Sequence, residues 1–255
     1  MSLCVVFVVN KGYFDKFINT CNQLLTNGCY KGNICLVVGE DLNNDTLLEN
    51  EFILKNNIII KYFKGIVFSE EFLIINNKVS SDGRNITRKF QWHKLHLFNV
   101  FFKNWDYIFY IDCGMTINSD ISPIINEKKE NTLLAHSDAY PSYEWKLRCQ
   151  FDGCPVHKDI DNYFTKLNNT YNLNIDYFQT GIVLYHTKII EENTFDNLIQ
   201  LMNDYPISRT NEQGIMALYF TIIHPLWEQI KIRNETTYFY DIIQRHNGRY
   251  IMRKY

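Results

Sequence analysis

Blocks of apolar and polar residues alternate along the chain, and their spacing predicts the elements of the fold. Four apolar runs, of which three are continuous and the third along the chain is interrupted by Lys61, are typical of strands buried on both faces of a parallel sheet. These runs are 3–9, 34–38, 58–63 and 107–111. Between them, apolar residues recur at helical spacing over 14–25 and 47–54. The alternation of strand and helix predicts parallel βαβ units in an α/β fold.

The second half of the chain continues the pattern with longer polar interruptions. The spacing predicts helices at 90–104, 195–202 and 212–220, and strands at 132–134 and 181–185. The stretch 141–174 is polar and aromatic, which predicts an irregular loop or lid beside an acceptor. Neither a repeat nor a linker rich in Pro, Gly or Ser marks a domain boundary. We therefore expect one α/β, Rossmann-like domain over 1–255, with a central, mostly parallel sheet flanked by helices.

Composition and charge exclude several classes of protein. Hydrophobic residues make up 46% of the chain and charged residues 21%, which argues against disorder and collagen-like repeats. The 26 Lys and Arg nearly balance the 28 Asp and Glu, for a net charge of −2. The overall positive field that attracts nucleic acids or anionic membranes is therefore missing, so an anionic ligand needs a local site.

The location of the protein is predicted from its apolar runs and its cysteines. The run at 3–9 is shorter than the roughly 20 residues of a membrane helix, and it lacks the basic flank of a signal peptide. The seven cysteines are scattered without C-x-x-C spacing, which fits reduced thiols. We expect a cytoplasmic protein without a membrane span. The sequence leaves open whether it forms a homodimer.

Asp112 is the most informative residue of the chain, because it directly follows the apolar run 107–111. Open α/β sheets bind their ligands at the carboxyl ends of buried strands, where this carboxylate would lie. A carboxylate there can bind Mg²⁺ or Mn²⁺, which in turn neutralises a diphosphate. An Asp that caps the next turn is an equally good interpretation of the position.

Two basic groups could act on an anionic ligand. Lys94, one turn into the helix before that strand, could direct its ammonium at a sugar hydroxyl or a diphosphate; the alternative is a solvated lysine. His246 lies in the basic, polar stretch 245–249, which suits a phosphate or a metal-bound phosphate; the alternative is a solvated C-terminal tail. His224 is flanked by apolar residues and is expected in the core.

Other side chains could contact a base or a sugar. Tyr13, after the first strand, could stack on a base, although a half-buried core tyrosine explains it nearly as well. Asp138 and Glu212 could bind sugar hydroxyls, with helix N-capping as the competing interpretation at Glu212. Tyr143 and Trp145 could form an aromatic platform for an acceptor sugar, or pack on the edge of the sheet.

Several of these segments together resemble glycosyltransferase family 8, which includes glycogenin and bacterial galactosyl- and glucosyltransferases. The helix-then-strand signature of that family resembles residues 90–97 followed by 105–112, and its D-I-x-x-L turn resembles residues 119–124. Four further segments resemble family motifs in the expected order. They are 9–13, 176–182, 211–215 and 245–249.

The resemblance implies a GT-A-type fold, a UDP-sugar donor, a glycan or other hydroxyl acceptor, a divalent metal, and transfer with retention at the anomeric carbon. The residues assigned to catalysis are Lys94, Gln179, Glu212 and Gln213. Those assigned to the nucleotide are Val9, Asn10, Tyr13, Arg88, Asp112, Cys113 and Gly114. Those assigned to the sugar or acceptor are Asp138, Asp176, Thr180 and Gly181. The metal ligands are expected to be Asp112 and His246.

The chain also departs from the family pattern. Gly114 stands where the family has the second Asp of D-x-D, so we expect Mn²⁺ or Mg²⁺ to bind weakly and to need the nucleotide. Gln179 replaces the usual Asn, and Glu212 the usual Asp, each with one more methylene and the same polar groups.

The departures keep two other functions under consideration. The missing carboxylate at Gly114 is compatible with a catalytically inactive protein of the same fold that binds nucleotide-sugars or carbohydrates. A sugar nucleotidyltransferase is less favoured, because it would need a Gly-rich, basic phosphate loop after the first strand, where only Lys11 and Gly12 are present.

Overall fold

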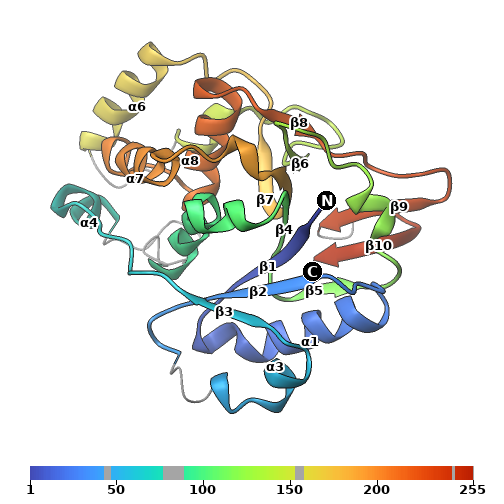
Figure 1. Cartoon of the computed structure of the whole chain (residues 1–255). Coiled ribbons are helices and arrows are strands. Elements are labelled where there is room, and N and C mark those ends of the chain that lie inside the picture. The colour runs from blue at the N-terminus through green and yellow to red at the C-terminus, as the bar shows by residue number, and fades with distance from the viewer. Residues whose placement is uncertain (43–46, 77–88, 153–157, 243–244, 255) are drawn as a thin grey trace.

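A computed structural model describes residues 1–42, 47–76, 89–152, 158–242 and 245–254. Its main sheet has seven strands (Figure 1). They are β1 Leu3–Val9, β2 Asn33–Val38, β3 Ile59–Tyr62, β4 Tyr107–Ile111, β6 Leu133–Ser137, β7 Phe178–His186 and β8 Trp227–Gln229. Their order in the sheet is β3-β2-β1-β4-β7-β6-β8.

The sheet is mostly parallel, as the sequence predicts. Strands β3, β2, β1 and β4 pair in parallel, and β8 is parallel to β6. Only β7 runs the other way, between β4 and β6. The strands predicted at 3–9, 34–38, 58–63 and 107–111 are all confirmed, within one residue at each end. Those predicted at 132–134 and 181–185 form part of the longer β6 and β7.

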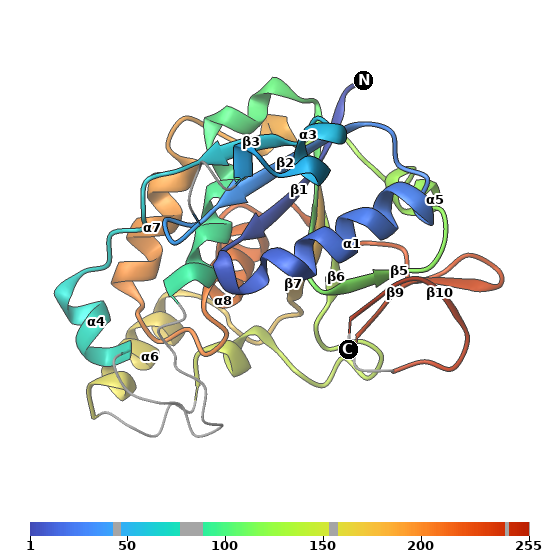
Figure 2. The ribbon, with the colours of Figure 1, turned by 90° about the horizontal axis from the view of Figure 1, so that it is seen from below.

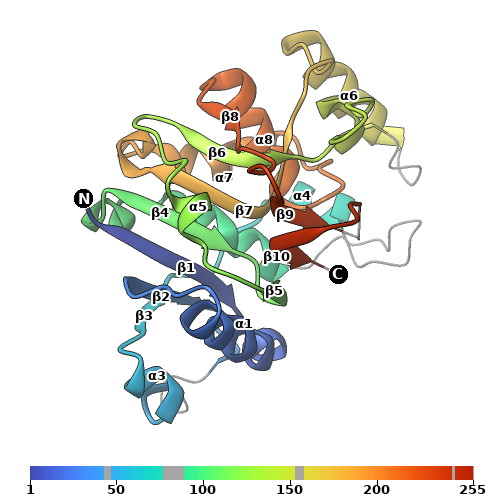
Figure 3. The same cartoon turned by 90° about the vertical axis from the view of Figure 1, so that its right-hand side faces the viewer.

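Helices cover both faces of this sheet. The α-helices are α1 Phe14–Thr26, α3 Glu51–Lys55, α4 Glu70–Asn76, α5 Ser122–Ile125, α6 Lys158–Thr170, α7 Thr194–Asp204 and α8 Glu212–Leu218. Short 3-10 helices are η1 Lys11–Tyr13, η2 Lys89–Phe98, η3 Val100–Asn104, η4 Leu147–Gln150 and η5 Thr187–Ile189, and a π-helical turn η6 spans Tyr219–Ile223. Helix α1 lies on one face, and α7 and α8 lie on the opposite face (Figures 2 and 3). None of the described helices is long and apolar enough to cross a membrane.

Strand β1 shows why a continuous apolar run is needed at the centre of the sheet. Its side chains alternate between two cores, so that Val6 packs in the core beneath α7 and α8, and Phe7 packs against Phe17 of α1. Each face of the strand is buried by a different helical layer. Apolar residues are therefore required at successive positions rather than at every second one.

A second sheet of three strands brings the C-terminus back to the middle of the molecule. Its strands are β5 Met115–Ile117, β9 Thr237–Ile242 and β10 Arg249–Lys254, in the order β5-β10-β9. Strand β10 pairs antiparallel with β5, Lys254 opposite Met115. The chain beyond the stretch 245–249 is not a solvated tail, because Tyr250, Ile251 and Met252 are buried in the core.

Two other predictions of local structure need correction. The helix predicted at 90–104 is two 3-10 helices, and the chain is extended at Asn99, whose side chain accepts a hydrogen bond from the Phe101 amide (3.0 Å). The stretch 141–174, predicted to be irregular, contains α6, which packs through Leu167. The helix predicted at 47–54 has its regular part in α3, because the Asn50 side chain caps the helix at that point.

Candidate active site

The candidate site lies where β1, β4 and β7 meet at one edge of the sheet. Strands β1 and β4 are parallel, so Asn10 and Asp112, which follow them, are at the same edge. Strand β7 is antiparallel and therefore begins at this edge. Its Gly181 carbonyl accepts a hydrogen bond from the Asp112 amide (2.9 Å). Ligands of open α/β sheets bind at this carboxyl-terminal edge.

A buried lysine joins two carboxylates at the centre of the site. The Lys94 ammonium, from η2, lies 2.9 Å from Asp112 Oδ1 and 2.9 Å from Glu212 Oε1. Glu212 is the first residue of α8, so the pairs connect β4, η2 and α8. The side chains of Lys94, Asp112 and Glu212 are 13%, 11% and 4% exposed. Three residues predicted for the site, far apart in the sequence, thus meet in one cluster.

The charges in this cluster are fixed by their neighbours. Burial alone would lower the pKa of Lys94, but the carboxylates of Asp112 and Glu212 outweigh burial and raise that pKa above its usual value. Burial would raise the pKa of Asp112, but the ammonium groups of Lys94 and Lys254 outweigh it and hold that pKa below its usual range. Lys94 is therefore protonated and Asp112 ionised at neutral pH.

Both oxygens of Asp112 already have partners. Oδ1 accepts hydrogen bonds from Lys94 and from the Tyr110 hydroxyl, and Oδ2 accepts one from the Lys254 ammonium of β10. The Lys254 side chain is 35% exposed, so its ammonium lies between the carboxylate and the surface. The sequence analysis missed Lys254, because the only signal was a basic residue after three apolar ones.

A hydrogen-bonded network extends from Glu212 along the start of β7. The Thr180 hydroxyl donates to Glu212 Oε1 (3.0 Å), and the Thr180 amide donates to Gln213 Oε1 (3.1 Å). Gln213 Nε2 in turn donates to Asp138 Oδ2 (3.4 Å), which also accepts from the Tyr177 hydroxyl (2.8 Å). The network links four residues predicted for catalysis or sugar binding. Tyr177 is a further member that the sequence analysis did not identify.

Gln179 presents a free donor beside this network. Its Oε1 accepts hydrogen bonds from the Gly181 amide (2.8 Å) and the Tyr240 hydroxyl (3.3 Å). Its Nε2 is buried and has no hydrogen-bond partner among the described residues. A Cβ at Gly181 would lie 2.5 Å from the Tyr240 hydroxyl and 2.6 Å from Gln179 Oε1. Only glycine therefore allows the Gln179 side chain to fold back over the strand.

The residues predicted to bind the base lie at the end of β1. Val9 is buried, and the Oδ1 atom of Asn10 is buried with no hydrogen-bond partner in the described part of the chain. Tyr13 is 37% exposed, and the Lys16 ammonium lies 4.9 Å from the centre of its ring. An orphaned amide oxygen and an exposed aromatic ring can bind a base, the first by accepting an N–H and the second by stacking.

Gly114 occupies the position of the missing carboxylate. Its φ of +86° lies in the left-handed region that favours glycine, and its amide donates to the Thr20 hydroxyl (3.1 Å). A Cβ there would lie 3.5 Å from Cδ of Lys16. Cys113, beside it, is directed back into the fold, with its thiol toward the Val8 carbonyl (3.6 Å). The stem of a lysine therefore lies where the second Asp of D-x-D would begin.

The remaining predicted residues are placed as follows. Asp176 forms an ion pair with Lys146 (2.6 Å) rather than with Lys94. The Asp138 carbonyl accepts a hydrogen bond from the Arg245 guanidinium (3.2 Å). Trp145 is 54% exposed, as an acceptor platform would require. Arg88 lies outside the described residues.

The described residues do not fit a divalent metal ion held by the protein. The ring of His246 stacks on Tyr238, with centroids 4.4 Å apart and planes at 2°, and has no recorded contact with Asp112. Among the residues described, no group of three or more His, Cys, Asp and Glu side chains is arranged to hold a metal. Mg²⁺ and Mn²⁺ need several oxygen ligands. Asp112, the carboxylate predicted to hold the metal, is already paired with two ammonium groups.

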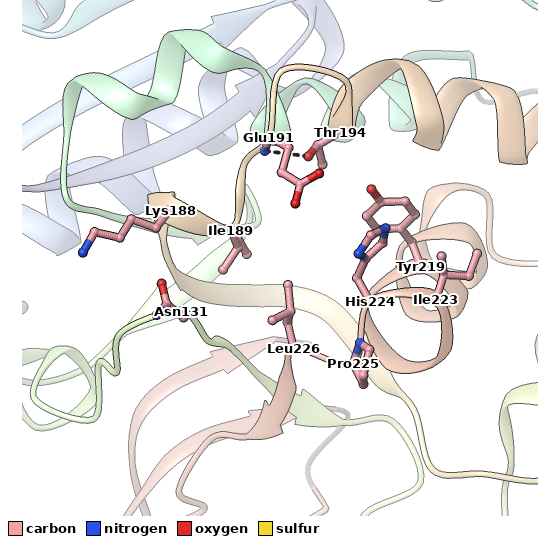
Figure 4. Close-up of a pocket in the computed structure, with 10 residues that line it drawn as sticks. All are labelled: Asn131, Lys188, Ile189, Glu191, Thr194, Tyr219, Ile223, His224, Pro225 and Leu226. Atoms are coloured by element: carbon pink, nitrogen blue, oxygen red, sulfur yellow. Dashed lines mark hydrogen bonds between the residues drawn. The ribbon is translucent and has the colours of Figure 1, made fainter.

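A separate cavity of about 360 Å³ lies at the opposite edge of the sheet, where β6 and β8 begin (Figure 4). It is lined by Lys188, Glu191, Tyr219 and His224, among others. His224, predicted to be a core residue, is half-buried at this cavity, with its ring against Tyr219. None of the residues predicted for the site lines it.

Comparisons of the sequence with protein-family models and with curated proteins found no match. Comparison of the structure found glycosyltransferases. Apo WbbM, a bifunctional glycosyltransferase, aligns over 100% of this chain and 45% of its own length, with 16% identity and a TM-score of 0.61. The galactosyltransferase LgtC, in complex with donor and acceptor sugar analogs, aligns over 99% of this chain and 86% of its own length, with 10% identity and a TM-score of 0.60. Core-mannan synthase A from Aspergillus fumigatus, in an Mn/GDP form, aligns over 93% of this chain and 76% of its own length, with 9% identity and a TM-score of 0.55.

These similarities show the fold of the chain. It is a mixed α/β structure with a central, mostly parallel sheet, like that of the GT-A glycosyltransferases. The chain spans less than half the length of WbbM. At identities of 16% or less, the comparisons do not distinguish family 8 from other GT-A families, so membership of family 8 stays a prediction.

Proposed function

We propose that this protein transfers a hexose from a UDP-sugar to the hydroxyl of a glycan or another acceptor, with retention of the anomeric configuration. One observation carries the proposal: the ammonium of Lys94 is held 2.9 Å from both Asp112 and Glu212 at the ligand-binding edge of a GT-A-type sheet. A buried, charged cluster at such an edge is typical of an active site rather than of a structural core.

The nucleotide is proposed to bind across the ends of β1 and β4. The orphaned Oδ1 of Asn10 can accept the N3–H of uracil, and the exposed ring of Tyr13 can stack on the base. Val9 supports this loop, Cys113 and Gly114 lie next to the diphosphate, and Arg88 keeps its assignment as a nucleotide ligand. UDP is the proposed nucleotide, and GDP is the alternative to be tested because two similar structures hold it.

The sugar is proposed to lie over the start of β7. The unpaired Nε2 of Gln179 can donate to the sugar or to the oxygen of the leaving phosphate. Asp138 and Thr180 can bind hydroxyl groups, while Gly181 gives the substrate close access to the backbone. Asp176 keeps its assignment to the acceptor.

A front-face reaction fits these groups, because no side chain in the described part of the chain is placed as an evident covalent nucleophile. The bond between the anomeric carbon and the UDP oxygen breaks, and a bond from that carbon to the acceptor oxygen forms on the same face. The acceptor proton passes to the phosphate oxygen of the departing UDP. Lys94, Glu212 and Gln213 hold the geometry of this edge, with Lys94 as a fixed positive charge near the developing negative charge.

The predicted cofactor has a limited part in this proposal. Mn²⁺ or Mg²⁺, expected on Asp112 and His246, would come as an ion carried by the nucleotide, because the described residues do not form a metal site on their own. No step above depends on it. A cytoplasmic location and a single domain over 1–255 also remain part of the proposal.

The test is release of nucleoside diphosphate from a panel of UDP-hexoses and GDP-mannose, with and without sugar acceptors. The proposal expects release from at least one UDP-hexose, and NMR of the product should show the donor's anomeric configuration. Binding of UDP without any release would instead favour the inactive binding protein that Gly114 suggests. Failure of both UDP and GDP to bind would refute both functions.

A further inference from the structure

We infer that Lys16 and Lys254 bind the diphosphate of the donor in the place that a protein-held divalent cation occupies in a D-x-D site. The inference rests on the proposed function and goes beyond it, because it assigns the neutralising charge to two lysines that no sequence motif identified. Lys94 then acts as a positioning residue, which orients Asp112 and Glu212.

The positions of the two lysines support this assignment. Lys254 donates to Asp112 Oδ2 from β10, while the stem of Lys16, from α1, passes 3.5 Å from the Cβ position of Gly114. The two side chains thus bracket the segment 112–114, where the D-x-D motif of related enzymes would bind a metal. The glycine that removes the second carboxylate also leaves the space that the Lys16 side chain approaches.

The charge count favours an anion at this point. Lys94 and Lys254 balance Asp112 and Glu212, so these four side chains together are neutral. Lys16 adds one positive charge and forms no ion pair within the described ranges. The five side chains together carry one positive charge, which disfavours a divalent cation here and favours a diphosphate.

Lys16 and Lys254 are more exposed to solvent than Lys94. Lys94 is 13% exposed and is held between two carboxylates, so its ammonium is committed to the protein. Lys254 is 35% exposed and Lys16 is exposed, so both ammonium groups can be reached by a ligand. An ammonium has three donors, so Lys254 can contact a phosphate while it keeps its bond to Asp112. If Lys254 served only to neutralise Asp112, that role would duplicate the role of Lys94.

The experiment measures UDP and GDP binding by calorimetry, with the full chain, in EDTA and in Mn²⁺. The variants are Lys254→Met, Lys254→Arg and Lys16→Met. The control is Lys31→Met, an exposed lysine two residues before β2 and therefore at the opposite edge of the sheet. A melting curve for each variant checks that it is folded.

The expected result is that the unmodified protein binds UDP in EDTA within about threefold of its affinity in Mn²⁺. Lys254→Met and Lys16→Met should each weaken UDP binding in EDTA by about tenfold or more, as expected for loss of a charge-assisted contact to phosphate. Lys254→Arg should keep most of the affinity, and Lys31→Met all of it.

Three results would overturn the inference. UDP binding that is lost in EDTA and restored by Mn²⁺ would show that a metal holds the diphosphate, and the proposed transferase would then stand without the two-lysine site. Unchanged affinity in both Met variants would assign Lys254 and Lys16 a structural role alone. If neither UDP nor GDP binds in either buffer, the proposed function fails and the inference fails with it.

Discussion

Replacing Lys94 with Met tests whether the buried cluster holds the candidate site together. The substitution keeps an unbranched side chain but removes the cation between Asp112 and Glu212, whose side chains are 11% and 4% exposed. Water cannot easily replace the ammonium at such positions. Removal of one partner from a buried ion pair costs about 3–5 kcal/mol, because a carboxylate stays buried without its cation.

We expect a loss near the lower end of that range, about 3 kcal/mol. Asp112 keeps a cation, because Lys254 donates to its second oxygen. Glu212 keeps only neutral partners, such as the Thr180 hydroxyl at 3.0 Å, and should account for most of the loss. Domains of this kind are stable by about 5–15 kcal/mol, so the variant should still fold at neutral pH.

The loss should also depend on pH. The pKa of Asp112 is held below its usual value by Lys94 and Lys254 against the effect of burial, so its contribution to stability is present above the unfolded pKa, about 3.9. That contribution is lost as the pH falls through the lower, folded pKa. Lys94→Met removes the part of this contribution that Lys94 supplies and leaves the part from Lys254, so the difference from the unmodified protein should shrink as the pH falls below about 4.

Urea unfolding at neutral pH and near pH 3 measures both effects. Lys188→Met is the matched control, because Lys188 and Glu130 form an exposed pair, 67% and 62% exposed and 3.9 Å apart, worth about 0–1 kcal/mol. The double variant Lys94→Met with Glu212→Leu should lose less than the two single changes added together. A loss below about 1 kcal/mol for Lys94→Met at neutral pH would refute the reasoning.

Three further predictions concern residues at the same edge. Gly114→Asp puts a side chain at a φ of +86° and a carboxylate near Lys16, so the free energy of unfolding should fall by about 1 kcal/mol, and the affinity for UDP in EDTA should fall too. Calorimetry that shows tighter binding of UDP would contradict this prediction. Gly181→Ala puts a Cβ 2.5 Å from the Tyr240 hydroxyl, so urea unfolding should show a loss of about 1–3 kcal/mol, and no loss would refute the close contact. Asp112→Asn should keep the circular dichroism spectrum but lower transfer by about a hundredfold or more; full activity would remove Asp112 from the mechanism.

The strands of the large sheet were the most predictable part of the fold. A strand such as β1 is covered by a helical layer on each face, so its sequence must be apolar at successive positions, and that pattern is visible without a structure. The helix α1 was equally clear, because its apolar residues share one face and Asn27-Gly28 follows its end.

Strand β10 could not be predicted in the same way. It carries three buried side chains, at 250–252, between basic residues, and one of its two partner strands, β5, is far away in sequence. Met252 pairs with Ile117 of β5, a contact that depends on the completed fold rather than on local pattern. The position of Lys254 beside Asp112 follows from that pairing, which is why sequence reasoning missed it.

In the candidate site too, the functional residues could be selected from the sequence, but their positions relative to one another could not. Lys94, Asp112 and Glu212 were all selected from the sequence, and the structure brings them together. Their mutual pairing was not predicted, because it needs the register of β4 against β7 and the placement of α8. His246 was selected as a metal ligand from its basic neighbours, but its ring stacks on Tyr238, an arrangement that composition does not indicate.

The order of strands at the site's edge adds an independent argument about the ligand. Neighbouring strands β1, β4 and β7 present in turn an orphaned acceptor at Asn10, the charged cluster at Asp112, and an orphaned donor at Gln179. A nucleotide-sugar has a base, a diphosphate and a sugar in that same order. The orphaned atoms of Asn10 and Gln179 are among eight buried side-chain polar atoms without partners in the described part of the chain, and such atoms are costly unless a ligand satisfies them. A UDP-sugar laid across the three strand ends would satisfy both and place its phosphates between Lys16 and Lys254.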